Sequence, residues 1–412
     1  MPPTRCYFRW SLPLACLLVL TGAPLVVAQQ ALQVHTDFPG GAAAVVRVDA
    51  KENLIQFKIP PHPNGGWASW WYFKVTGIQP GDTLRLQQLS GIARPRQAVY
   101  SLDGKTWHFT PSALTVKMEG TEVTTFTQKI DGKEAWFAWY VPFVPRDAEA
   151  VIDRAVQQCE FAKKFELCQS EDGISVPGIR FHEPGASDDE RFGVWIQARQ
   201  HAWEVGGSWT AAGLIDWLAS DDPRAQALRR KAAVSIVPIM DVDSVQKGLG
   251  GKNQKPHDHN RDWSDMPVWK AVQSAMSQTK GLDKQGKLDV LLDLHDPGWS
   301  GAFDFWCHAY QVMTPTRRRN TDRFMAACKE EVVGLLRCNG KVIVRYPLTT
   351  PTAGIWACTA TRDHVVGGTF EIGVGPPAGY QGGPVDYHLL AGKQLGLALE
   401  KYLQAGIRQI EK

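Results

Sequence analysis

The feature that most constrains the fold of this chain is a change in hydrophobic period near Pro145. Before it, from about Val34 to Val144, short runs such as Leu54–Ile59 alternate apolar and polar residues, and Pro, Gly, Asn and Asp separate them. A period of two indicates half-buried strands, and many short strands with turns are typical of an antiparallel β-sandwich. We therefore expect a β-sandwich domain over residues 29–145.

After Pro145, apolar runs alternate with segments of helical spacing. The apolar runs are Phe192–Ile196, Ala232–Ile239, Leu288–Leu294, Val342–Val344 and Thr369–Val374. The predicted helices are Ala148–Leu167, Trp209–Ala219, Val268–Gln278, Arg318–Leu336 and Val385–Leu403. This alternation predicts an α/β fold over residues 146–412, a mixed β-sheet flanked by helices. Ligands of such sheets bind at strand ends, so functional residues are sought there.

The first 28 residues have the pattern of an export signal. Arg5 and Arg9 precede a mostly apolar run from Leu12 to Val27, and small residues end it at Ala28. We expect an exported protein, periplasmic or extracellular; an uncleaved anchor or lipid attachment at Cys16 are the alternatives. No later run is long and apolar enough to cross a bilayer, so no stable membrane insertion is expected after cleavage.

Charge and cysteine content narrow the function classes. The chain has 45 Lys+Arg and 42 Asp+Glu, and the expected mature form, without the two signal arginines, has a net charge of about +1. This charge gives no attraction to nucleic acid, so no nucleic-acid partner is expected. Six cysteines follow the signal, and disulfides persist in exported proteins. Cys159 with Cys168 and Cys328 with Cys338 are the local pairings, and buried thiols are the alternative.

Two strand ends carry residues that suit a metal ion. The first apolar run leads into R-Q-H-A-W-E, which places His201 and Glu204 three residues apart, and a later run ends on His295. H-x-x-E is common by chance, and an exposed His and Glu are the competing interpretation. Two nitrogens and one carboxylate leave a fourth position on zinc open, as in catalytic sites. We therefore predict one zinc ion bound by His201, Glu204 and His295.

Other polar residues complete a candidate catalytic site. Glu371 stands inside an apolar strand and is a candidate general base; a strand-edge glutamate facing water is the alternative. Asn260 and Arg261 lie in a turn-rich segment, and a guanidinium fork fits a substrate carboxylate, although a solvated loop arginine is as compatible. The segment His257–His259 is a rival metal cluster of poorer geometry.

The motifs ARQHAWE, HNRDW, DLHDPG and GGTFEIGVG, in this order, resemble the zinc metallocarboxypeptidase family. The N-terminal half, with Trp-Trp-Tyr-Phe at 70–73, resembles the β-sandwich of the cytosolic-carboxypeptidase branch. The resemblance implies that the predicted ligands hold zinc and that Glu371 deprotonates the zinc-bound water. It also implies that Asn260 and Arg261 bind the free C-terminal carboxylate of a peptide or protein, and that Asp258 orients His201. The implied reaction is hydrolysis of the C-terminal peptide bond.

The chain departs from the family pattern at several positions. Where the family has an arginine upstream of the Asn-Arg pair, Lys252 is the nearest cation, and we assign it oxyanion stabilisation; a solvated loop lysine is the alternative. Trp203, between the ligands, is expected to narrow the pocket, and Asp296 to place a carboxylate near the substrate groove. Tyr346 is the candidate for the family's catalytic tyrosine.

Two other functions compete with this one. The same zinc site could act on peptidoglycan stem peptides or N-acyl amino acids, because both offer a carboxylate to Arg261. The clustered Trp67, Trp70 and Trp71 could instead form the platform of a non-catalytic peptide- or sugar-binding protein, although large aromatics more often pack in cores. Neither a phosphate loop nor the nucleophile elbow of serine hydrolases is present.

Overall fold

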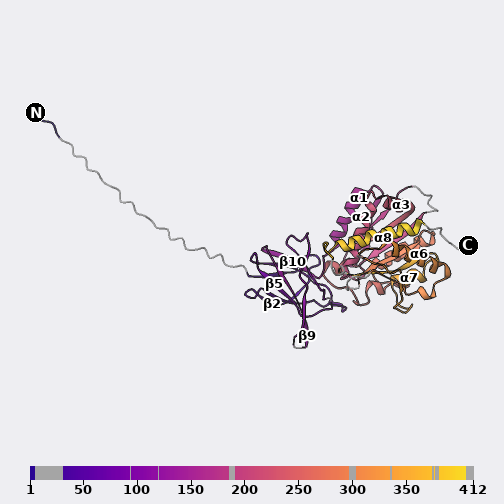
Figure 1. Ribbon diagram of the computed structural model, residues 1–412, viewed down its shortest axis with the longest axis horizontal. Coiled ribbons are helices and arrows are strands. Elements are labelled where there is room, and N and C mark those ends of the chain that lie inside the picture. Colours follow the sequence, from indigo (N-terminus) through magenta and orange to yellow (C-terminus); the bar gives the residue numbers. More distant parts are fainter. Residues whose placement is uncertain are drawn as a thin grey trace. The chain divides into compact units, whose positions relative to one another are not determined.

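The computed structural model describes residues 1–4, 31–92, 94–118, 120–184, 191–296, 303–334, 336–373, 375 and 380–404 (Figure 1). The expected export signal lies outside these residues, so it stays a prediction. Among the helices that are described, none combines the length and the apolar character that a membrane span requires. From Ala31 onward the chain forms one compact unit.

The N-terminal half of this unit contains, among the described residues, two five-stranded sheets with the orders β1–β4–β10–β6–β7 and β2–β3–β5–β9–β8. The strands are β1 Gln33–His35, β2 Ala44–Asp49, β3 Leu54–Lys58, β4 Tyr72–Thr76, β5 Thr83–Gln88, β6 Val99–Ser101, β7 His108–Phe109, β8 Leu114–Met118, β9 Thr121–Lys129 and β10 Glu134–Ala138. The pairs are antiparallel except β3 with β5, which run parallel and correct the expectation of a wholly antiparallel sandwich. The reason is that the chain crosses to the other sheet as β4 before it returns as β5.

Aromatic side chains fill the space between the two sheets. Phe57 of β3 contacts Phe73 of β4, with ring centroids 5.1 Å apart, and Trp71 contacts Phe126 of β9 at 5.6 Å. Trp70 and Trp71 are buried, at 3% and 0% exposure. They therefore serve as core, and they cannot form an exposed binding platform.

The C-terminal half contains an eight-stranded mixed sheet, in the order β11–β12–β14–β13–β15–β18–β16–β17 among the described residues. Its strands are β11 Ala162–Gln169, β12 Ser175–Phe181, β13 Phe192–Ala198, β14 Ala232–Val237, β15 Val290–His295, β16 Phe303–Trp306, β17 Val342–Ile343 and β18 Val366–Ile372. The central strands β14, β13, β15 and β18 are mutually parallel. Every residue of β13 and β15 is buried, which requires that both faces of the sheet are covered.

Helices flank this sheet, as expected (Figure 1). They are α1 Pro145–Gln158, α2 Val205–Ala219, α3 Pro223–Lys231, α4 Val242–Gln246, α5 Lys270–Lys284, α6 Pro315–Glu331, α7 Ala353–Thr359 and α8 Asp386–Gln404, with 3-10 turns at His259–Arg261 and Tyr310–Val312. The predicted helix Ala148–Leu167 is wrong beyond Gln158, because the chain turns there and pairs as β11 with β12. Strand β12 was missed because its sequence, SVPGIRF, contains Pro and Gly.

The six cysteines within the described ranges are free thiols. Neither of the local pairings expected from the sequence is formed. The sulfurs of Cys307 and Cys358 are instead 3.5 Å apart, and both side chains are buried. These residues are distant in sequence, and they meet because β16 and α7 both pack against β18.

Candidate active site

Parallel strands bring the predicted metal-binding residues to one edge of the sheet. The turn after β13 carries His201 and Glu204, and Glu204 immediately precedes α2. His295 is the last residue of β15, and the strand register pairs it with Glu371 of β18. Because the carboxyl ends of parallel strands share one edge, four side chains far apart in the sequence meet there.

The side chains of His201, Glu204 and His295 form a compact buried cluster. Each offers one ligand atom, and these atoms all lie within 4.8 Å of one another. The two oxygens of Glu204 contact the Nδ1 atoms of His201 and His295, at 2.8 and 2.6 Å. Two imidazole nitrogens and one carboxylate are the donor set of catalytic zinc sites that keep an open position, so these residues fit zinc.

A carboxylate holds the far side of each imidazole. Asp258 Oδ1 lies 3.3 Å from Nε2 of His201, and Asp293 Oδ2 lies 2.7 Å from Nε2 of His295. Such contacts orient a metal-binding histidine and leave the other nitrogen for the ion. Asp258 was expected in this place, whereas Asp293 was missed. Its signal is the D-x-H spacing of β15, since residues two apart on a strand share one face.

Glu371 faces this cluster with an unsatisfied oxygen. Its Oε2 atom is buried and has no hydrogen-bond partner among the described residues. Burial raises the pKa of Glu371 to about 7, against the opposing charge of His295. A buried carboxyl with a pKa near neutrality can accept a proton and return it, as a general base must.

Lys252 lies directly beside the cluster. Its Nζ atom is 3.0 Å from Glu204 Oε1 and 3.5 Å from His201 Nδ1. Burial opposes its charge, but Glu204 and Glu371 outweigh this effect and raise the pKa of Lys252. Trp67 covers the ammonium, with the ring centroid 5.2 Å away, and its backbone N–H donates to Lys252 O. The β-sandwich half therefore contributes to the surroundings of this lysine.

Asn260 and Arg261 occupy the 3-10 turn beside the cluster, with different roles. Asn260 Oδ1 accepts the N–H of Ala353 at 2.9 Å, so its carbonyl oxygen is engaged within the protein, and its Nδ2 lies 3.2 Å from His295 Nε2. The guanidinium of Arg261 lies over the ring of Tyr346, 5.1 Å from its centroid, and donates to Asn260 O. No carboxylate of the described residues pairs with Arg261, which leaves it suited to bind an anion.

Two sequence expectations are corrected by the packing. Trp203 packs between Trp67 and Trp139, with centroids 6.1 and 5.2 Å away, so it fills the contact with the β-sandwich half and does not narrow a pocket. Asp296 is fully buried and accepts the N–H of Gly206 at 3.2 Å. It therefore lies at the N-terminus of α2, where a negative charge is favourable, and not in a substrate groove.

The turn that carries His201 is held by Arg199, which the sequence did not single out. Arg199 has a positive φ of 64°, a conformation unfavourable for residues other than glycine. Its buried guanidinium donates to Ala202 O at 2.6 Å, to Phe143 O at 3.2 Å and to Ser208 Oγ at 3.2 Å. These bonds stabilise the strained turn and fix it to the segment that precedes α1.

Known protein families match both halves of the chain. The model of the zinc carboxypeptidase family matches residues 148–286, and that of the cytosolic carboxypeptidase N-terminal domain matches residues 34–140. Over residues 148–286 the chain is thus similar to the zinc carboxypeptidase family. The match to the catalytic part contains His201 and Glu204 but ends before His295 and Glu371. Those two residues are joined to the site by the strand register and, for His295, by its contact with Glu204.

Curated relatives are distant and differ in length. An uncharacterized protein of Zymomonas mobilis is 28% identical over 271 residues, which cover 64% of this chain and 67% of that protein. Human cytosolic carboxypeptidase 1 is 25% identical over 236 residues, covering 47% of this chain and 19% of that protein. The chain thus matches only about a fifth of the length of the human relative.

Solved structures share the fold over almost the whole chain. The metallo-carboxypeptidase from Burkholderia cenocepacia has a TM-score of 0.77 at 19% identity, covering 91% of this chain and 99% of that one. The metallo-carboxypeptidase from Pseudomonas aeruginosa, in complex with (2-guanidinoethylmercapto)succinic acid, has a TM-score of 0.73 at 21% identity, covering 89% and 98%. The chain thus shares the fold of these metallo-carboxypeptidases.

Proposed function

We propose that this protein is an exported zinc-dependent carboxypeptidase that hydrolyses the C-terminal peptide bond of peptides or proteins. The observation that carries the proposal is the buried cluster of His201, Glu204 and His295 beside the unsatisfied carboxyl of Glu371. An internal carboxylate with no partner is costly unless it is used, and here it adjoins a donor set for zinc. One zinc ion is proposed, in keeping with the single cluster found among the described residues.

The zinc ion would supply a Lewis acid that polarises a water molecule and the substrate carbonyl. Glu371 accepts the proton of the attacking water and later delivers it to the leaving amine. The ammonium of Lys252 stabilises the negative charge that develops on the carbonyl oxygen, a contribution of a few kcal/mol for one oxyanion donor in other hydrolases. Asp258 and Asp293 keep the two imidazoles in the orientation that metal binding requires.

Recognition of the chain end is assigned to Arg261. Its guanidinium lies beside the cluster, and it makes no ion pair within the described part of the chain. A planar guanidinium binds a carboxylate through two parallel hydrogen bonds. The carbonyl oxygen of Asn260 accepts the N–H of Ala353, so we assign this residue first to holding the turn. Tyr346, under Arg261, lies where it can contact the same residue of the substrate.

Export is proposed on the charged and apolar pattern of the first 28 residues. The names of the relatives called cytosolic carboxypeptidases suggest the cytoplasm instead. N-terminal sequencing of the protein recovered from its native host decides between them. A mature terminus near Gln29 supports export, and an intact Met1 in the cytoplasmic fraction contradicts it.

The proposed reaction is tested by metal analysis together with a library of C-terminal peptides. We expect about one zinc per chain, and release of single C-terminal residues that a chelator abolishes and added zinc restores. Glu371→Gln should keep its zinc and lose activity by a factor of about 10² to 10⁴. The full-chain protein is also assayed on muropeptides and N-acyl amino acids.

The outcomes separate the competing functions. If the protein hydrolysed muropeptides or N-acyl amino acids but not ordinary peptides, the result would favour the alternative function of a zinc amidase. Cleavage of internal bonds only would exclude an exopeptidase. If Glu371→Gln kept full activity, the assignment of the general base would be wrong, and a protein without zinc and without activity would favour a binding function.

A further inference from the structure

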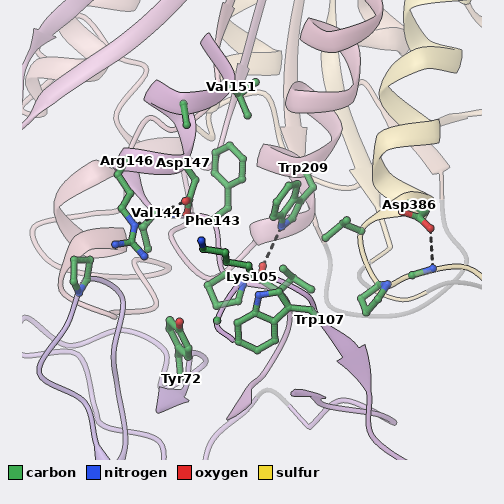
Figure 2. A pocket seen from close by; sticks show the side chains of 18 of the residues that line it. Tyr72, Lys105, Trp107, Phe143, Val144, Arg146, Asp147, Val151, Trp209 and Asp386 are labelled. Carbon is green, nitrogen blue, oxygen red and sulfur yellow. Dashed lines mark hydrogen bonds and ion pairs between the residues drawn. The ribbon is translucent and has the colours of Figure 1, made fainter. Parts of the chain in front are cut away.

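A cavity of about 610 Å³ lies away from the residues assigned to catalysis (Figure 2). Its walls come from the loop between β6 and β7, the segment 141–144, the first turns of α1, residue 209 of α2 and the segment 383–386. None of the residues assigned to zinc, to the general base or to the substrate carboxylate lines it. Small-molecule sites are typically concavities of roughly 300–1,000 Å³, so the cavity is large enough for a ligand.

Two aromatic pairs form the walls of this cavity. Tyr72 and Trp107 come from the β-sandwich half and meet edge to face, with centroids 5.9 Å apart. Phe143 and Trp209 form the second pair at 4.9 Å, also edge to face. The indole N–H of Trp209 donates to Val141 O at 3.0 Å, which fixes this ring. Trp107 and Trp209 are both partly exposed, so their faces are available to a flat apolar group.

Lys105 brings a positive charge into this aromatic space. Figure 2 shows its side chain in the middle of the lining residues, near Trp107 and Asp147. The backbone at Lys105 is fixed, because Asp103 Oδ1 accepts the N–H groups of Lys105 and Thr106 at 2.8 and 2.7 Å. No hydrogen bond or ion pair with another described residue reaches its ammonium.

The two carboxylates of the lining, Asp147 and Asp386, are hydrogen-bonded to backbone groups and not to this ammonium. Asp147 Oδ2 accepts the N–H of Val144 at 2.8 Å. Asp386 Oδ2 is bound to the N–H of Gly383 at 2.8 Å. Arg154 is paired with Asp216 outside the lining. Arg146 adds a second cation, whose nearest carboxylate is its neighbour Asp147 at 3.9 Å.

We propose that this cavity binds a small organic anion that carries one carboxylate on a flat apolar body. The carboxylate pairs with the ammonium of Lys105, and the apolar body lies against Trp107 and Trp209. The unpaired ammonium of Lys105 favours an anion, and the aromatic walls favour a planar molecule over inorganic phosphate or sulfate. The proposal is independent of the proposed hydrolytic function, because it uses none of the same residues.

The test is isothermal titration of the full-chain protein with 1-naphthaleneacetate, compared with the neutral amide 1-naphthaleneacetamide. Binding of the anion is expected to be saturable, with one site per chain outside the active site. Lys105→Gln removes the charge and shortens the side chain by one atom. It should weaken binding of the anion about tenfold, since a hydrogen bond between charged groups is lost. The amide should bind the two proteins equally weakly.

Two control variants locate the site. Lys117→Gln removes an exposed lysine of the same half that does not line the cavity, and it should leave the Kd unchanged. Arg261→Gln should also leave this Kd unchanged, which excludes binding of the probe at the proposed substrate site. Trp107→Leu should weaken binding of both probes. The proposal is overturned if no saturable binding is found, if anion and amide bind equally well, or if only Arg261→Gln affects binding.

Discussion

Replacement of Asp293 by Asn tests whether the cluster is held for a metal ion. Asp293 Oδ2 lies 2.7 Å from His295 Nε2 and also accepts a bond from Gln200, while its Oδ1 is buried without a hydrogen-bond partner among the described residues. In Asp293→Asn the amide oxygen can keep the contacts of Oδ2, and the new NH₂ group takes the place of Oδ1. The variant therefore removes charge with little change of shape.

The expected effect follows from the loss of charge on this bond. A charge-assisted hydrogen bond is about twice as strong as a neutral one, a difference of about 1–2 kcal/mol. We expect zinc to bind roughly 5- to 30-fold more weakly, near the effect seen when outer partners of metal-binding histidines are removed. Competition with a chromophoric chelator measures this Kd, and circular dichroism checks that the variant is folded.

A control variant and a comparison of two carboxylates make this prediction more specific. Asp216→Asn makes the same chemical change at an exposed ion pair with Arg154, and it should not change the zinc affinity. Asp258→Asn should have a smaller effect than Asp293→Asn, because its contact with His201 is 3.3 Å. A Kd of Asp293→Asn within twofold of the parent protein would refute the reasoning.

Three further predictions concern other parts of the catalytic half. Lys252→Met should lower kcat about 10²- to 10³-fold without weakening zinc binding, and Lys252→Arg should keep part of the parent kcat. Equal kcat in the parent protein and both variants would contradict the oxyanion role of Lys252. Burial, with Arg261 and Arg345 nearby, lowers the pKa of His308 to about 4, and its neutral Nδ1 accepts the N–H groups of Arg345 and Tyr346 at 3.1 and 3.2 Å. The imidazole of His308 therefore binds a proton more tightly in the unfolded state than in the folded state, so the free energy of unfolding should fall by about 2 kcal/mol from pH 7 to pH 5. Urea titrations of His308→Gln should lack this loss. When the protein is refolded with glutathione disulfide, the thiols of Cys307 and Cys358 should form one disulfide and release two glutathione molecules. Alkylation followed by mass spectrometry tests this, and alkyl groups on both cysteines would contradict it.

Much of the fold could be predicted because the hydrophobic period is local. The runs Phe192–Ile196 and Leu288–Leu294 are found in β13 and β15, and α8 begins within one residue of the prediction. The parts that were wrong depend on pairing between distant segments. The parallel pair β3 and β5, and the strand β11 in place of the end of a helix, are decided by which neighbour offers hydrogen bonds.

The residue types of the site were also within reach of the sequence. A histidine and a glutamate after one strand, a histidine at the end of another and a glutamate within a third all suggested a metal centre. The distances between these residues could not be predicted from the sequence. The roles of Asp293 and Arg199 could not be predicted either. Apart from the D-x-H spacing of Asp293, nothing in the sequence singles these residues out, and their roles are seen in contacts with His295 and with the turn around Ala202.

The sequence by itself determined the central strands of the C-terminal half, most of its long helices and the chemical groups that stand at the strand ends, because period and residue type are properties of a short stretch of chain. Only the tertiary structure decided that His201, Glu204, His295 and Glu371 converge, that Trp203 and Asp296 serve packing, and that Lys252 lies beside Glu204. The physical reason is that the register of parallel strands and the burial of charge depend on segments tens of residues apart, which no local pattern encodes.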